Sequence, residues 1–246
     1  MSDDTLVLCY HALSERFPAH MSTTPQRFAC QLRWLARRGY KGVTFSEAVG
    51  SPPERTVAVT FDDGYQSVLR LGLPILQCLG WPATIFVPTD FIGSDQPMSW
   101  PGIDRWLGGE HESELLPLAW EELETLTSHR WEVGSHTCSH PKLTELDDDA
   151  LARELSESKS SCELRLGRSC PALAYPYGDV DSRVVRAAQA AGYNSAAALP
   201  ARPGPESPLE WPRVGVYFKD NLARFSVKSS PLTRRMRSAR ASTSRR

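Results

Sequence analysis

Two adjacent carboxylates, Asp62 and Asp63, follow a short apolar run and precede Gly64 within residues 60–65. Neighbouring side chains of a strand point to opposite faces, but a turn at Gly64 could bring both carboxylates near one centre in different roles. Asp-Asp-Gly is also a favourable turn sequence without any chemistry. Taken alone, this cluster therefore favours a simple turn.

Two histidines four residues apart, His136 and His140, follow another apolar run. On one helical face or turn, this spacing can present two nitrogen ligands to one ion, although such pairs also arise by chance. Together with a carboxylate they form a set that binds zinc, iron or a related divalent ion and leaves positions open for water and substrate. Cys138 would face away from both histidines on a helical turn, so we expect it in the core.

A third cluster, residues 173–178, contains the stretch Tyr175-Pro176-Tyr177-Gly178. Pro176 and Gly178 favour a turn. The two tyrosines could then form the wall of a groove for a sugar ring. A strand that ends in a tight turn accounts for the same residues equally well.

All three clusters follow predicted strands, which indicates how they could be brought together. Strand and helix patterns alternate along the chain, which predicts a parallel sheet covered by helices, and closure into a barrel suits one domain of this size. The carboxyl ends of parallel strands then meet around one opening. The expected strands are residues 6–10, 41–45, 56–61, 83–87, 131–134, 171–175, 194–198 and 211–216, and the expected helices begin near residues 24, 68, 120, 147 and 182. Residues 94–114 show no clear pattern and are expected to form a long surface excursion.

The composition excludes several other classes of protein. The chain has 246 residues, 41% hydrophobic and 23% charged, with a net charge of −1, which argues against a nucleic-acid or anionic-membrane partner. We see no apolar run of the ~18 residues that a transmembrane helix needs, and no secretory signal, so we expect a cytoplasmic location. The six cysteines show no metal-binding spacing and are expected to be free thiols.

The charge distribution suggests where the folded domain ends. Residues 228–246 contain seven basic residues and no acidic one. Such a run is typical of a flexible, solvated segment. We therefore predict one domain over residues 1–222 and a flexible basic tail over residues 223–246.

The order T-F-D-D-G, S-H-T-x-x-H and A-Y-P-Y-G resembles the polysaccharide deacetylase family, also called the NodB-homology domain or carbohydrate esterase family 4, from about Leu6 to Val216. The resemblance implies an α/β fold, a distorted (β/α)7 barrel, with one divalent metal ion, usually Zn²⁺. It implies Asp62 as the general base and Asp63, His136 and His140 as metal ligands. Tyr177 would lie beside the substrate, its backbone N–H helping to hold the oxyanion.

The sequence also departs from the commonest family pattern. No histidine follows His140, although the family usually takes its acid from a late L-x-x-H motif, and Ala174 stands where an arginine is usual. His11 closes the first predicted strand, which resembles the branch that acts on poly-N-acetylglucosamine, where an early Tyr-His supplies the acid. We therefore assign the acid to His11; the alternative is a histidine that caps the strand through backbone hydrogen bonds.

The missing arginine could be replaced from the last predicted strand. Arg213 could approach the carboxylates there and lower the pKa of Asp62, although an exposed arginine paired with a surface acid is an equal alternative. Trp100 and Trp120 could stack on sugar faces or belong to the core. The residues expected to contact substrate are Tyr175, Pro176, Tyr177 and Arg213.

Three functions agree with these residues. The first is removal of N-acetyl groups from an amino sugar or an N-acetylglucosamine-containing glycan. The second keeps the metal site but acts on another amide or an ester, as a deformylase or O-deacetylase. The third is a catalytically silent carbohydrate-binding barrel. The intact set of Asp62, Asp63, His136 and His140 argues against silence, because a binding protein has no need of all four.

Overall fold

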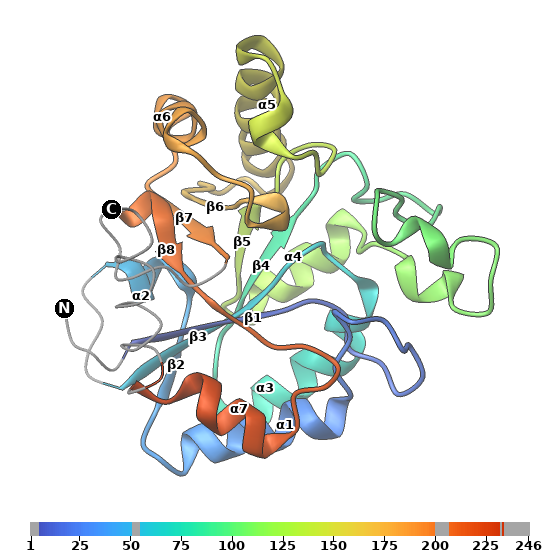
Figure 1. Ribbon diagram of the computed structural model, residues 1–246, viewed down its shortest axis with the longest axis vertical. Helices are drawn as coiled ribbons and strands as arrows, with labels where there is room; N and C mark the ends of the chain where they lie inside the picture. Colours follow the sequence, from blue (N-terminus) through green and yellow to red (C-terminus); the bar gives the residue numbers. More distant parts are fainter. Residues whose placement is uncertain (1–4, 51–54, 200–206, 232, 234–246) are drawn as a thin grey trace.

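The computed structural model describes residues 5–50, 55–199, 207–231 and 233 and shows a parallel sheet that curls into a nearly closed barrel (Figure 1). The strand order is β8-β7-β6-β5-β4-β3-β1-β9, with β2 paired to the first half of β3. The ladders are parallel throughout this path. The predicted distorted (β/α) barrel is therefore confirmed.

The central strands are apolar on both faces because both are covered. β1 (Leu6–Tyr10) and β3 (Thr56–Phe61) are buried along their whole length. Runs of this kind are typical of parallel strands that lie between a core and a layer of helices. The remaining strands are β2 (Lys41–Val43), β4 (Thr84–Val87), β5 (Glu132–Ser135), β6 (Ala172–Ala174), β7 (Ser195–Ala198), β8 (Trp211–Pro212) and β9 (Val214–Gly215).

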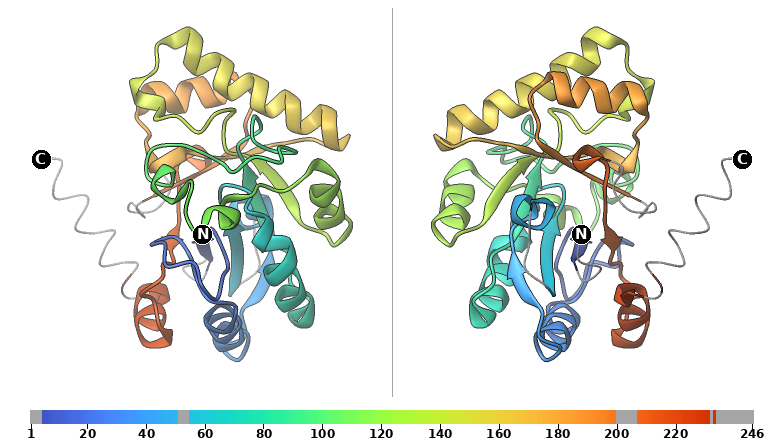
Figure 2. Two further views of the ribbon diagram at one scale, coloured as in Figure 1. Left: turned by 90° about the vertical axis from the view of Figure 1, so that its right-hand side faces the viewer. Right: turned by 90° about the vertical axis from the view of Figure 1, so that its left-hand side faces the viewer.

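Local capping signals set the helix limits. Thr24 accepts a hydrogen bond from the Arg27 N–H at the start of α1 (Pro25–Ala36). Asp147 caps α5 (Asp148–Leu166) in the same way, and Gly167, with φ of 61°, ends it. The other helices are α2 (Phe45–Val49), α3 (Leu73–Leu79), α4 (Trp120–Ser128), α6 (Ser182–Ala190) and α7 (Leu222–Ser229). Figure 2 shows α5 and α6 on one side of the barrel and α1, α3 and α7 on the opposite side.

The last predicted strand is interrupted, which corrects the expected single strand over residues 211–216. β8 pairs with β7, whereas β9 pairs with β1 at the other end of the strand path. The chain therefore crosses the gap between the two ends of the sheet at Arg213, whose N–H donates to the Ala198 carbonyl. This crossing places Arg213 at the point where the barrel closes.

Two further expectations change. Residues 94–114 contain only the short 3₁₀ turns η2 (Asp104–Trp106) and η3 (Glu112–Leu115), but Met98, Trp100 and Ile103 are buried, so the segment packs onto the barrel. α7 extends past residue 222, and Phe225 is buried against Trp34. The folded part therefore includes α7, and residues 234–246 of the predicted tail lie outside the described residues.

Two expectations from composition can be compared with the structure. All six cysteines are free, and four of them, including Cys138, are buried. Within the described ranges, none of the helices combines the length and the apolar character that crossing a membrane requires.

Candidate active site

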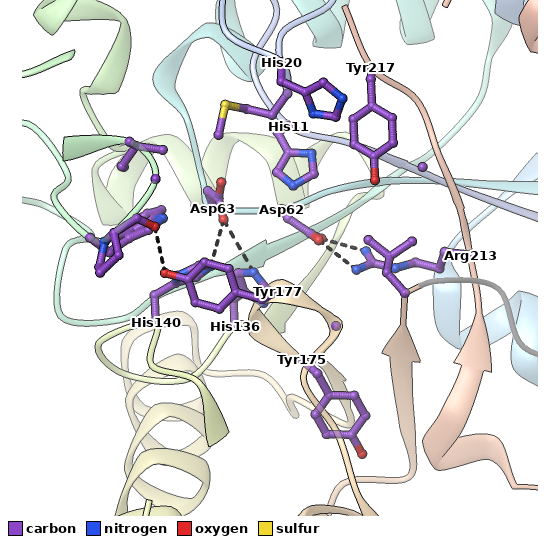
Figure 3. Close-up of a pocket in the computed structure, with 18 of the residues that line it drawn as sticks. His11, His20, Asp62, Asp63, His136, His140, Tyr175, Tyr177, Arg213 and Tyr217 are labelled. Atoms are coloured by element: carbon purple, nitrogen blue, oxygen red, sulfur yellow. Dashed lines mark hydrogen bonds and ion pairs between the residues drawn. The ribbon is translucent and has the colours of Figure 1, made fainter. Parts of the chain in front are cut away.

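The predicted site residues gather at the carboxyl end of the barrel (Figure 3). Asp62 and Asp63 follow β3, and His136 follows β5, which is separated from β3 by β4 alone. Tyr177 follows β6, the next strand along the path. His11 follows β1, which lies on the other side of β3. The strand order therefore brings together residues that are far apart in the sequence.

Three buried ligand atoms face one another across a short gap. The Oδ1 atom of Asp63 lies 3.4 Å from Nε2 of His136 and 3.4 Å from Nε2 of His140. Both distances exceed normal hydrogen-bond lengths, and Asp63 Oδ1 has no hydrogen-bond partner in the described part of the chain. A tetrahedral ion with ligand bonds of about 2.1 Å separates its ligand atoms by about 3.4 Å. The triad can therefore hold one divalent cation.

Each histidine of the triad is oriented in a different way. Nδ1 of His136 lies 2.7 Å from the carbonyl oxygen of Ala174, at the end of β6. If Nδ1 carries the proton and donates it there, the lone pair of Nε2 faces Asp63, as a metal ligand requires. The ring of His140 instead stacks on Trp100, with centroids 4.2 Å apart, and meets Tyr177 edge-on. The contacts with Trp100 and Tyr177 therefore hold the ring of His140 in place.

Burial and neighbouring charges shift the pKa of each residue of the triad. Burial alone would raise the pKa of Asp63, but the two imidazoles hold it well below its usual range. Burial lowers the pKa of His140, which favours the neutral form that binds metals. For His136 the effect of burial is outweighed by the two carboxylates, and its pKa is raised. A bound cation would compete with that proton for the same nitrogen.

Backbone strain is concentrated at the site. Asp63, Thr137, His140 and Tyr177 have φ values of 71°, 69°, 62° and 58°, four of the six positive values among the described non-glycine residues. A left-handed conformation costs such residues on the order of 1–3 kcal/mol each. The two histidines consequently lie in a loop after β5 rather than on a helical face.

Asp62 forms a buried ion pair with Arg213. Nη1 and Nη2 of Arg213 each lie 2.7 Å from one Asp62 oxygen, and both residues are at most 2% exposed. The Cys9 thiol donates to Asp62 Oδ2 at 3.3 Å. Burial alone would raise the pKa of Asp62, but the guanidinium reverses the shift and lowers it to about 2. The carboxylate is therefore ionised and fixed in orientation.

This pair decides between the two sequence hypotheses for Arg213. The guanidinium approaches Asp62, as predicted, and its Nη1 also donates to Thr60 at 3.0 Å. Because both terminal nitrogens are committed to protein oxygens, the geometry favours a positioning role rather than the expected substrate contact. The alternative of an exposed surface pair is wrong.

A cavity of about 890 Å³ opens above the carboxylates. Tyr177, a residue that is 46% exposed, borders it, and its backbone N–H has no acceptor among the described residues. Tyr175 also borders the cavity, but its ring is buried and points away in Figure 3, and its hydroxyl donates to the Leu209 carbonyl. Of the predicted aromatic pair, only Tyr177 is therefore placed to contact a sugar ring.

The structure adds residues to the site that the sequence patterns did not single out. His11 borders the cavity as expected, close to Asp62 and Cys9. His20, Tyr217 and Lys228 also border it, although they belong to no recognised motif. Trp120 does not line this cavity. The rest of the lining consists of Met21, Trp100, Pro101, Gly102, Ile103, Gly178, Leu199, Val214 and Gly215.

Comparisons with known proteins agree with this architecture. A family model for polysaccharide deacetylases matches residues 49–196. A Bacillus subtilis protein named as a polysaccharide deacetylase is 26% identical over 193 residues, which cover 76% of this chain and 61% of that protein. A poly-beta-1,6-N-acetyl-D-glucosamine N-deacetylase of Staphylococcus aureus is 25% identical over 174 residues, covering 69% of this chain and 58% of the relative. The chain thus spans about three fifths of the length of these two relatives.

Solved structures share the same fold. IcaB from Ammonifex degensii aligns over 96% of this chain and 98% of its own, with a TM-score of 0.73 and 24% identity. The deacetylase PplD of Streptococcus pyogenes aligns over 92% of this chain and 98% of its own, with a TM-score of 0.76 and 20% identity.

Proposed function

Since the chain belongs to the polysaccharide deacetylase family, we propose that it is a metal-dependent hydrolase that removes N-acetyl groups from an amino sugar or an N-acetylglucosamine-containing glycan. The observation that carries the proposal is the convergence of Asp63, His136 and His140, in which the Asp63 Oδ1 atom lies 3.4 Å from each imidazole Nε2, beside the ionised Asp62. The names of the staphylococcal relatives support the choice of an N-acetyl group.

Zn²⁺ is the proposed ion, because two imidazoles and one carboxylate with room for a further ligand suit it. When bound, it would polarise the amide carbonyl and make water more acidic. Asp62 accepts the proton of the attacking water, and Arg213 keeps that carboxylate ionised and aligned. The Tyr177 N–H donates to the oxygen on which negative charge develops.

The departing amine needs a proton, and His11 is the proposed donor. His11 borders the cavity beside Asp62, and its Nδ1 has no hydrogen-bond partner in the described ranges. Histidine suits this step because it changes charge near neutral pH. Among the described residues, the remaining histidine near the carboxylates is His20, which stacks on Tyr217.

Acetate release from N-acetylglucosamine and its oligomers, with and without a chelator, tests the proposal. We expect release that a chelator abolishes and added Zn²⁺ restores. Metal binding without acetate release would favour a different acyl group, which formate release and ester hydrolysis assays would identify. Absence of both metal binding and hydrolysis would contradict the proposal and leave the silent carbohydrate-binding barrel.

Metal binding is expected to stabilise the fold through the triad. Zn²⁺ at 100 times its dissociation constant should add about 2.7 kcal/mol to the free energy of unfolding. His136→Ala should weaken Zn²⁺ binding by at least about 100-fold, since it removes a direct ligand and loss of an outer contact alone costs 10–100-fold. Thermal unfolding with graded Zn²⁺ measures both effects. His129→Ala, a change at an exposed histidine that contacts Gln77, should respond like the wild type.

Replacement of His11 separates proton donation from metal binding. His11→Ala should lower kcat by about 10²–10⁴-fold, the range for a lost general acid, while the Zn²⁺ content stays at one ion per chain. Steady-state acetate release and metal analysis of the same sample provide the measurement. Wild-type kcat in this variant would remove His11 from the mechanism.

A further inference from the structure

Residues 137–140, which we call the ligand loop, follow His136 and end at His140 without forming a helix or a strand. Thr137 and His140 have left-handed backbone conformations, with φ values of 69° and 62°. The N–H of His140 donates to the Thr137 hydroxyl at 3.2 Å. Strained conformations persist only where surrounding contacts hold them. The contacts of the ligand loop therefore decide where the second imidazole lies.

Backbone groups that follow β4 hold the carbonyl side of the ligand loop. The N–H of Thr89 donates to the Thr137 carbonyl, and the N–H of Asp90 donates to the Cys138 carbonyl, both at 3.1 Å. These bonds leave the N–H groups of Cys138 and Ser139 without a partner from the strands. Because a backbone N–H away from water needs an acceptor, another part of the chain has to supply one.

The acceptor is one carboxylate of α5, that of Glu154. Its Oε2 atom accepts the N–H of Cys138 at 2.7 Å and the N–H of Ser139 at 3.0 Å. Its Oε1 atom accepts the Ser139 hydroxyl at 2.6 Å. Hydrogen bonds to a carboxylate are roughly twice as strong as those between neutral groups. Glu154 therefore ties the middle of the ligand loop to a helix of 19 residues.

The next turn of α5 supports the beginning of the same loop. The Thr137 N–H donates to the hydroxyl of Ser135 at 3.1 Å. That hydroxyl donates to Ser158 at 2.8 Å, and Ser158 donates to the Glu154 carbonyl at 2.6 Å. The helix thus contacts the ligand loop at two successive points, and the Glu154 side chain makes the contact nearer to His140.

We infer that Glu154 is a positioning residue for the metal site, which holds the ligand loop so that His140 faces Asp63 before a cation binds. This inference rests on the proposed function. Glu154 does not line the cavity, so it acts through the Cys138 and Ser139 N–H groups and not as a ligand. A ligand that is already in place loses less conformational freedom on binding. Without the carboxylate, the loop can relax from its strained conformation, and cation binding has to restore it.

Zn²⁺ titration of the full chain by calorimetry tests this role. Glu154→Ala should weaken Zn²⁺ binding by about 10–100-fold, the range for loss of an outer contact that orients a metal ligand. Glu154→Gln should restore most of the affinity, because its amide oxygen can accept both N–H groups and its amide nitrogen can donate to the Ser139 hydroxyl. Affinities are compared well below the unfolding temperature of each metal-free protein, so that loss of global stability does not contribute.

Glu157→Ala on the same helix is the matched control. Burial and the charges of Glu154 and Glu157 raise the pKa of Asp90, so both glutamates act on the same region. Glu157 is exposed, and none of the hydrogen bonds to the ligand loop described above involves it. The control removes the same side chain and the same charge, and its Zn²⁺ affinity should equal that of the wild type.

Amide hydrogen exchange of the metal-free protein gives a readout that needs no cation. In Glu154→Ala the N–H groups of Cys138 and Ser139 should exchange faster, and in Glu154→Gln they should not. Faster exchange in a protein whose wild type binds no Zn²⁺ would contradict the proposed function and support the role of Glu154 in holding the loop.

Three results would overturn the inference and leave the proposed function standing. The first is wild-type Zn²⁺ affinity and unchanged amide exchange in Glu154→Ala. The second is an equal loss of affinity in Glu154→Gln, because the charge and not the hydrogen bonds would then matter. The third is an equal loss in Glu157→Ala, which would show a general effect of removing negative charge near the site.

Discussion

The Asp62→Asn variant should lose at least about 100-fold in kcat for acetate release, the lower limit for removal of a general base. Asparagine has nearly the same shape but cannot accept the proton of the attacking water. Asp63, His136 and His140 are unchanged, so Zn²⁺ binding should persist. The measurement is single-turnover acetate release together with the metal content of the same preparation.

Interpretation of that variant requires a measurement of stability. The introduced asparagine would leave the guanidinium of Arg213 buried without a charged partner, so part of any loss of activity could come from unfolding. Activity is therefore compared well below the unfolding temperature of each protein. Asp148→Asn, at an aspartate that is 87% exposed and paired with Arg183, is the control and should keep full activity. Wild-type kcat in a folded, Zn²⁺-loaded Asp62→Asn protein would show that another group is the base.

The Arg213→Met variant should lose about 3–5 kcal/mol of unfolding free energy, because it leaves the Asp62 carboxylate buried without its partner. For a chain of this size that loss corresponds to roughly 6–20 °C in Tm. The same variant should lower kcat, since Asp62 loses the two contacts at 2.7 Å that align it. Chemical denaturation and thermal unfolding measure the stability.

Two comparisons separate the buried pair from general effects of losing an arginine. Arg183→Met breaks a more exposed pair with Asp148, at 2.9 Å, and should change stability by no more than about 1 kcal/mol. The double variant Asp62→Asn with Arg213→Met should recover much of the stability that either single variant loses, because no buried charge is left unpaired. It should recover none of the activity. Additive losses in the double variant would show that the two side chains are not coupled.

Left-handed backbone conformations allow the candidate metal ligands Asp63 and His140 to lie close together. Asp63 and His140 both adopt left-handed backbone conformations, and each brings a ligand atom to within 3.4 Å of the other. Trp100 stacks on the ring of His140, and Met98, Trp100 and Ile103 are buried. Persisting strain of this kind requires surrounding structure that holds it, and Trp100 supplies such a contact for His140.

Much of the fold and the convergence of the candidate metal ligands could be predicted from the sequence. Apolar periodicity identified β1, β3, β4 and the long helix α5, because burial on one face or both leaves a local pattern. Parallel strands have their carboxyl ends at one edge, so residues just after them, such as Asp63 and His136, were expected to meet. The structure places them as that reasoning requires.

Other features were decided only by the tertiary structure. Arg213 lies 151 residues from Asp62, and their pairing depends on how the chain crosses between β8 and β9 to close the barrel. The stacking of Trp100 on His140 and the position of Tyr217 depend on loops without any periodic pattern. Local sequence determines which segments become strands because burial repeats along each one. The partner of a buried polar side chain across the barrel is set by closure and loop packing, which leave no repeat in the sequence.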